Sequence, residues 1–118
     1  YFVGRSHDGL LDAPEILYQP YKFNEMNILF RDHYLSDQIG FTYARMDAAQ
    51  AAAHFLEHVK QNARKAAQNL NRPPLIPVVL DGENCWEFYP QDGQLFLKEL
   101  YAKIEQDDEI VCTTVSDY

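Results

Sequence analysis

The clearest periodic pattern in the chain lies in residues 47–70. Asp47 and Gln50 open this stretch with the spacing of a capping box, in which the first side chain caps a helix. Pro73 and Pro74 follow it and cannot continue a helix. We therefore predict a helix from Asp47 to about Leu70. Its apolar face, at helical spacing, comprises Ala52, Phe55, Leu56, Val59, Ala63, Ala66 and Leu70.

Three shorter apolar runs predict strands. They are Asn27–Arg31, which ends at Asp32, then Leu75–Leu80 and Ile110–Val115. An almost wholly apolar run such as the second is typical of a parallel strand that is buried on both faces. Pro77 weakens this interpretation, because proline cannot donate a hydrogen bond to a neighbouring strand.

The remaining stretches predict one more helix and two irregular regions. Glycines and prolines punctuate residues 1–26, which we read as mostly a loop lead-in with a short strand near Tyr1–Val3. His33–Arg45 reads as a polar loop. A second amphipathic helix follows the loop Asp81–Gln91 and carries Leu95, Phe96, Leu100, Tyr101 and Ile104.

The order strand, helix, strand, helix, strand predicts an α/β fold with a parallel β-α-β-α-β arrangement. Three strands cannot close a barrel and leave unpaired edges. We therefore expect residues 1–118 to be a single segment of a larger fold. We also expect the isolated segment to associate with itself through Ile28–Phe30 or Val111–Thr113.

Composition and charge narrow the possible partners and the cellular location. The chain has 118 residues, of which 47% are hydrophobic, so a single modest core is possible. A net charge of −8 repels phosphate backbones, which argues against nucleic acid as a partner. No apolar run approaches the roughly 20 residues that span a bilayer. Cys85 and Cys112 are too few for a disulfide framework, so we expect reduced thiols and a cytoplasmic protein.

Two acidic residues stand at positions where parallel α/β folds place functional groups. Asp32 follows the first predicted strand and Asp81 the second, so both are expected at the same edge of the sheet. The loop after Asp81 combines acids, an amide and aromatic side chains, including Glu83, Asn84, Trp86 and Tyr89. Aromatic rings stack on sugar faces, and a carboxyl group can protonate a glycosidic oxygen. The alternative is that the acids cap turns and the aromatic residues fill the core.

Three stretches resemble glycoside hydrolase family 57, in its amylopullulanase-like and uncharacterised branches. Leu80–Pro90, read LDGENCWEFYP, is similar to the fourth conserved region of that family. Leu29–Phe41, read LFRDHYLSDQIGF, resembles a stretch found upstream of that region, and Thr114–Tyr118, read TVSDY, resembles one found downstream. The three matches occur in family order and touch most of the chain after Leu17.

The resemblance implies that the chain is a segment of an incomplete (β/α) barrel. It also implies an α-glucan or oligosaccharide as substrate and a retaining mechanism that needs no metal or other cofactor. Asp81 then matches the general acid/base, and Glu83 is a supporting acid. Arg31 and Asp32 belong to the upstream motif and are expected near the sugar. Trp86, Asn84, Tyr89 and His33, which adjoins that motif, are candidate substrate-binding residues.

The chain also departs from the family pattern. The glutamate nucleophile and the histidine-containing first region of the family have no match here. A Pro-Glu pair at Pro14–Glu15 is not assigned as the nucleophile, because it lies too close to Asp81 along the chain. We expect the isolated chain to be inactive, because retaining hydrolysis requires two carboxyl groups.

Alternatives from other classes remain open at this point. One is a non-catalytic carbohydrate-binding or interaction module, and another is a metal-dependent hydrolase that uses Asp32 and Asp81. His54–His58 fits the H-x-x-E-H pattern of inverted zinc proteases. However, the helical spacing places His54 and His58 on the polar side of the predicted helix, so we expect no metal site there.

Overall fold

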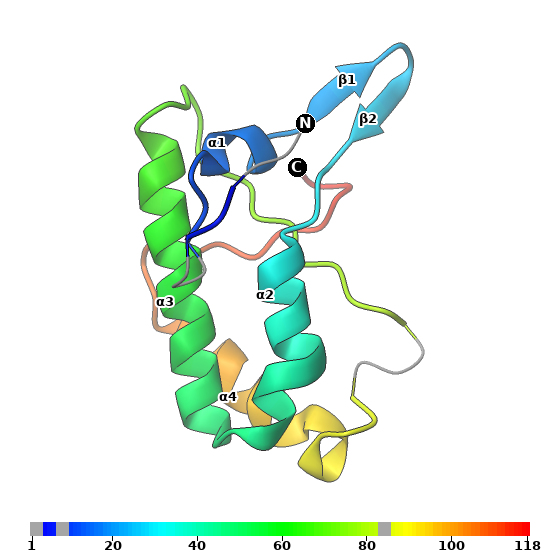
Figure 1. Ribbon diagram of the computed structural model, residues 1–118, viewed down its shortest axis with the longest axis vertical. Coiled ribbons are helices and arrows are strands. Elements are labelled where there is room, and N and C mark those ends of the chain that lie inside the picture. Colours follow the sequence, from blue (N-terminus) through cyan, green and yellow to red (C-terminus); the bar gives the residue numbers. More distant parts are fainter. Residues whose placement is uncertain (1–3, 7–9, 83–85) are drawn as a thin grey trace.

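A computed structural model describes residues 4–6, 10–82 and 86–118 of the chain. The described residues combine helices with one antiparallel pair of strands (Figure 1). In chain order the elements are α1 (Pro14–Leu17), β1 (Tyr21–Phe23), β2 (Met26–Ile28), α2 (His33–Asp37), the π-helical turn η1 (Gln38–Thr42), the 3₁₀ turn η2 (Tyr43–Arg45), α3 (Ala48–Ala67), the 3₁₀ turn η3 (Pro90–Gly93) and α4 (Gln94–Glu105).

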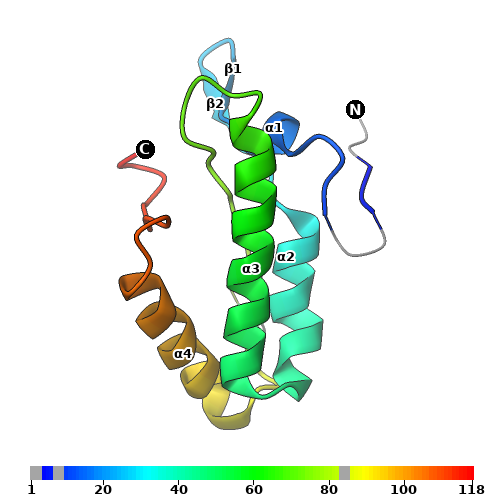
Figure 2. The same cartoon turned by 90° about the vertical axis from the view of Figure 1, so that its left-hand side faces the viewer.

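Both helices expected from the periodicity are confirmed. The Asp47 carboxylate accepts a hydrogen bond of 3.0 Å from the backbone N–H of Gln50, so the predicted N-cap of α3 is formed. This helix ends three residues before Leu70. In α4, Phe96 and Leu100 are buried and provide its contact with α3. Figure 2 shows α3 between α4 and α2.

The prediction of a loop at residues 33–45 is wrong, because this stretch is helical through α2, η1 and η2. Leu35, Ile39 and Tyr43 are spaced four residues apart and are all buried, so they form one apolar face at helical spacing. Asp32 caps the first turn by accepting a hydrogen bond of 3.0 Å from the N–H of Leu35. The polar residues between these positions concealed that face.

The first expected strand is shorter and more exposed than predicted. Only Met26–Ile28 is a strand, and it pairs antiparallel with β1 in a hairpin whose turn holds Asn24 at a φ of 52°. None of residues 27–31 is buried, and the Phe30 side chain is 45% exposed, so the expectation of a buried strand is incorrect. The strand expected near residues 1–3 lies outside the described residues.

The second and third expected strands are irregular segments here. Hydrogen bonds join Leu75 N to Tyr18 O at 2.9 Å and Asp32 N to Pro77 O at 3.0 Å. The backbone of residues 75–80 therefore contacts the loop preceding β1 and the start of α2, instead of a neighbouring strand. Residues 110–115 form no ladder either. Among the described residues, the parallel β-α-β-α-β arrangement is not found.

The main core lies where α3 meets α4 and the helical stretch 33–45. It contains Leu35, Ile39, Tyr43, Ala51, Ala52, Phe55, Leu56, Tyr89, Phe96 and Leu100. A smaller cluster of Leu11, Tyr18 and Ala66 holds the N-terminal residues against the other end of α3. These two clusters fix α2 and residues 75–80 beside each other, and the candidate site lies there. Within the described residues, no helix is long and apolar enough to cross a bilayer.

Candidate functional site

Asp81 lies in a pocket of about 380 Å³ that three separate stretches of the chain form together. Residues 31–41 provide one side, residues 79–81 another, and Phe88 completes it. This volume is within the usual range of small-molecule sites, roughly 300–1,000 Å³. The lining residues are Arg31, His33, Ser36, Asp37, Gly40, Phe41, Val79, Leu80, Asp81 and Phe88. The structure therefore brings together Asp81, Arg31 and His33, which the sequence had selected from two distant motifs.

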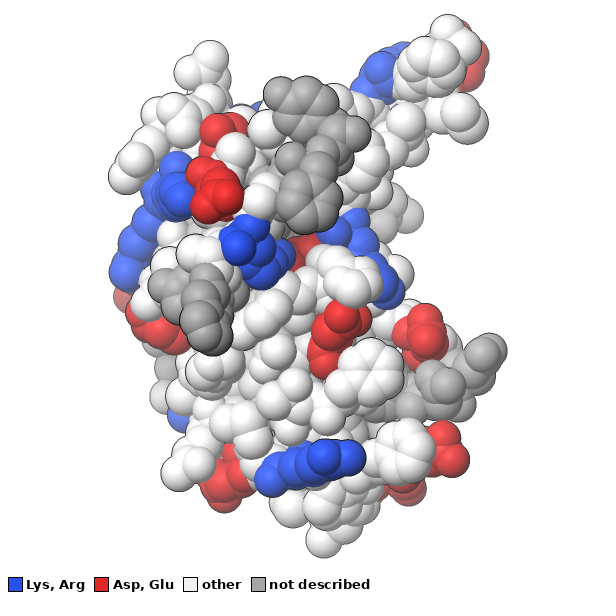
Figure 3. Space-filling view, in the orientation of Figure 1, with Lys and Arg blue, Asp and Glu red and all other residues white. Residues whose placement is uncertain are grey.

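Charged groups of both signs surround the pocket. His33 Nδ1 lies 3.1 Å from Asp37 Oδ2, one helical turn further on. The side chain of Arg31 extends toward residues 79–81, and its Nη1 lies 3.5 Å from the carbonyl oxygen of Val79. The Arg31 guanidinium is thus held next to the segment that ends at Asp81. Acidic and basic side chains are interspersed over the face drawn in Figure 3, so the negative net charge is not gathered into one block there.

Asp32 does not line this pocket, although it lies between two residues that do. Its carboxylate is fully buried and accepts a hydrogen bond of 2.8 Å from Arg5 Nη2 and one of 2.5 Å from the Tyr18 hydroxyl. Burial, followed by the negative charge of Asp32, raises the pKa of Tyr18, so this hydroxyl remains a proton donor at neutral pH. Asp32 is therefore a buried anchor for the turn carrying Arg31 and His33, and it presents no group to a sugar.

The two aromatic residues expected to bind substrate lie toward the core instead. Tyr89 is 7% exposed, and its hydroxyl donates a short hydrogen bond to the carbonyl oxygen of Ile39. Trp86 is half-buried. The centroid of its ring lies 5.3 Å from that of the Tyr89 ring and 6.3 Å from that of the Phe96 ring. Gly93 allows this packing, because a Cβ atom there would lie 2.5 Å from Trp86 Cε3.

Two aromatic residues that the sequence reasoning missed do line the pocket. Phe41 and Phe88 are 73% and 74% exposed. A signal for Phe41 was present in the sequence, because it lies midway between Ile39 and Tyr43 and so outside the buried helical face. The candidate residues Glu83 and Asn84, with Cys85, lie outside the described residues.

The histidine pair of the H-x-x-E-H pattern forms contacts within the protein. His54 Nδ1 lies 2.7 Å from the Tyr43 hydroxyl, and His58 Nδ1 lies 3.1 Å from the carbonyl oxygen of His54. Burial and the neighbouring His58 lower the pKa of His54. His54 and His58 are both half-buried, so the expectation that they lie on the polar side of the helix holds only in part. Glu57 accepts a hydrogen bond of 2.6 Å from Gln61, and no cluster of three possible metal ligands occurs in the described ranges.

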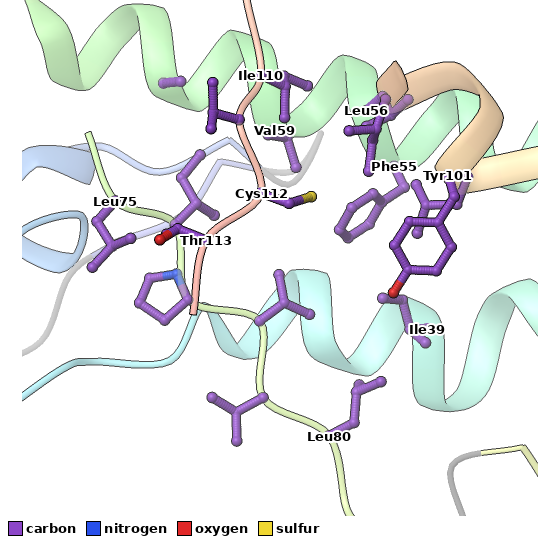
Figure 4. A pocket seen from close by; sticks show the side chains of 18 of the residues that line it. Ile39, Phe55, Leu56, Val59, Leu75, Leu80, Tyr101, Ile110, Cys112 and Thr113 are labelled. Atoms are coloured by element: carbon purple, nitrogen blue, oxygen red, sulfur yellow. The ribbon is translucent and has the colours of Figure 1, made fainter. Parts of the chain in front are cut away.

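A larger pocket of about 560 Å³ lies between α3, α4 and the two irregular segments (Figure 4). Its labelled side chains include Phe55, Leu56 and Val59 from α3 and Ile110 from the C-terminal segment. Most lining residues are apolar, and Glu109 is the sole Asp, Glu, Lys, Arg or His among the described residues that line it. This larger pocket offers no arrangement of acids or bases for catalysis. The pocket around Asp81 is therefore the better candidate site, although it is smaller.

Comparison with known proteins identifies the family of this chain. The sequence model described as glycosyl hydrolase family 57 matches residues 1–118. No curated protein and no solved structure matches the chain significantly. This match over the whole sequence agrees with the three family-like stretches, which occur in family order. Two of these stretches contain residues of the Asp81 pocket. Family membership implies a glycosidase-like domain and a carbohydrate substrate. The chain therefore belongs to glycosyl hydrolase family 57.

Proposed function

We propose that this chain is part of the catalytic barrel of a retaining glycoside hydrolase or transglycosidase that acts on α-glucans, with Asp81 as general acid/base. The observation that carries this proposal is the convergence of Asp81 with Arg31 and His33 in one pocket. These residues come from two stretches that resemble family motifs. Asp81 is exposed, so its carboxyl group is accessible to a substrate.

In the proposed reaction, Asp81 protonates the glycosidic oxygen as the bond to the leaving sugar breaks. A second carboxylate attacks the anomeric carbon and forms a covalent glycosyl–enzyme bond. Asp81 then removes a proton from the incoming water or acceptor sugar, which attacks the same carbon and breaks the bond to that carboxylate. We assign that second carboxylate to a region outside residues 1–118. The cationic side chain of Arg31, which lines the same pocket, can bind hydroxyl groups of the sugar.

We further propose that residues 75–80 and 110–115 are barrel strands in the complete catalytic domain, and that residues 1–26 lead into it. Their apolar composition supports this, as does the α/β character of the described elements. In that arrangement a neighbouring strand provides the regular ladder of backbone hydrogen bonds that these segments do not form here. We place the enzyme in the cytoplasm on the basis of its sparse cysteine content.

Of the alternatives, the metal-dependent hydrolase using Asp32 and Asp81 is not supported. Arg5 and Tyr18 already occupy the Asp32 carboxylate, which is buried away from the Asp81 pocket. A non-catalytic carbohydrate-binding module remains the second candidate, because the chain has no match for the family's glutamate nucleophile. It predicts oligosaccharide binding without turnover.

The experiment that tests the proposal replaces Asp81 with asparagine in the protein that carries this chain. Asp81→Asn preserves size and removes the transferable proton, so turnover of maltooligosaccharides should fall by about 10²–10⁴-fold. An activated aryl glucoside should lose less in the bond-breaking step, because its leaving group needs little protonation. Asp108→Asn, at an exposed loop position, is the matched control. Wild-type turnover by the Asp81 variant would refute the assignment.

A further inference from the structure

Phe41 and Phe88 are the two most exposed aromatic side chains among the described residues, and both line the pocket that contains Asp81. Exposed aromatic rings at a pocket point to a ligand, because contact with a ligand removes their apolar surface from water and so stabilises the complex. The pair comes from separate parts of the chain. Phe41 lies on η1, a π-helical turn of the kind that often occurs at functional sites, and Phe88 precedes Tyr89 in the turn before η3.

The two rings are mounted on a common internal support. Tyr89, adjacent to Phe88, donates its hydroxyl hydrogen bond to the carbonyl oxygen of Ile39, two residues before Phe41. Ile39 and Tyr89 are both buried in the main core. The backbone positions of the two exposed rings are therefore tied together across 47 residues of chain by one buried contact.

The chemistry around the rings selects the class of ligand. Arg31, His33, Asp37 and Asp81 line the same pocket and provide hydrogen-bond donors and acceptors. A purely apolar partner would remove water from these groups without replacing its hydrogen bonds, at a cost in free energy. A sugar ring satisfies both halves of the surface, since its C–H face stacks on an aromatic ring while its hydroxyls bind polar side chains.

We propose that Phe41 and Phe88 form the sugar-stacking surface of this pocket and hold a glucosyl unit of an α-glucan next to Asp81. This proposal rests on the proposed function for the identity of the sugar. It transfers to Phe41 and Phe88 the stacking role that the sequence had suggested for Trp86 and Tyr89, which pack toward the core.

The test measures binding and turnover separately. In the Asp81→Asn background, where substrate is not consumed, the affinity for maltotetraose or a longer maltooligosaccharide is measured by calorimetry. Phe41→Ala and Phe88→Ala should each weaken binding by about 3–10-fold, as expected for loss of one aromatic contact. Phe41→Trp and Phe88→Trp should retain binding, because stacking needs a ring and not phenylalanine itself.

Phe23→Ala is the matched control, since Phe23 is 61% exposed on β1 and does not line this pocket. Urea unfolding confirms that each alanine variant folds, as expected for substitutions at exposed positions. Affinities of both pocket variants equal to that of Phe23→Ala would overturn the proposal, as would an absence of oligosaccharide binding by the parent protein. Failure of the proposed function appears differently, as wild-type turnover by Asp81→Asn.

Discussion

Asp32 shows how a single residue can belong to a functional motif and still act from inside the protein. Its carboxylate contacts Arg5, Tyr18 and the N–H of Leu35, three groups from different parts of the chain. The neighbouring residues Arg31 and His33 are consequently held at the surface of the pocket. An acid in a family-like motif beside a site can thus determine the position of its neighbours without lining the pocket itself.

This arrangement predicts a large loss of stability when Asp32 is removed. Asp32→Ala leaves the buried Tyr18 hydroxyl without its acceptor and the Arg5 guanidinium without this partner, which should cost about 3 kcal/mol in the free energy of unfolding. Asp32→Asn should cost less, because an amide oxygen still accepts a hydrogen bond. Urea denaturation measures both. Asp37→Ala, which removes a partly exposed carboxylate, is the control and should have a small effect. An Asp32→Ala protein as stable as wild type would contradict the anchoring role.

At the scale of elements, the turn before α4 depends on the close approach of a glycine to an aromatic ring. Gly93 has a φ of 77° and forms the N-cap position of α4. Trp86 packs directly against it and also contacts Tyr89 and Phe96. This contact positions the turn that carries Phe88, so the geometry of the pocket depends on a residue outside it.

Gly93→Ala should therefore destabilise the protein by about 2 kcal/mol, because alanine disfavours a positive φ and its Cβ would clash with the indole ring. Thermal unfolding gives the loss of stability. The fluorescence of Trp86, the single tryptophan in the chain, reports whether the ring is displaced. Gly40→Ala is the matched control, since a Cβ atom there meets nothing within 4 Å. If the two variants have the same melting temperature, the packing argument for Gly93 fails.

At the scale of the whole molecule, two of the places where the described residues leave apolar surface bear on association between copies. β2 pairs only with β1 within the described ranges, and the segment after β2 includes the partly exposed Phe30. Val111, in the irregular C-terminal segment, is 87% exposed. Such surfaces favour association with another protein surface, whereas the net charge of −8 opposes indiscriminate aggregation.

We therefore predict that the isolated 118-residue chain forms a defined oligomer through Ile28–Phe30 or Val111–Thr113. Sedimentation velocity over a range of concentrations should show a species larger than the monomer. Val111→Asp or Phe30→Asp should shift the distribution toward the monomer, according to which segment forms the contact. Ala102→Asp, at an exposed position of α4, adds the same single negative charge and is the control. A strictly monomeric chain at high concentration would contradict the prediction.

The sequence by itself determined the features that depend on local spacing. Asp47, Gln50 and the apolar positions after them predict α3 correctly, because a capping hydrogen bond and a helical face involve residues within one or two turns. The same logic could have found α2 and η1 from Leu35, Ile39 and Tyr43. Three short motifs in the right order also identified the family, and with it Asp81 as the candidate acid.

Only the tertiary structure decided the features that depend on partners distant in the chain. Residues 75–80 have the composition of a strand, yet their backbone bonds to Tyr18 and Asp32, since a strand exists only where another strand accepts it. Burial likewise depends on which segments pack together. The packing of these segments places Tyr89 in the core, leaves Phe88 exposed, and separates Asp32 from Asp81. These outcomes depend on free-energy differences between alternative packing arrangements of the chain. A local pattern of residues therefore does not predict them.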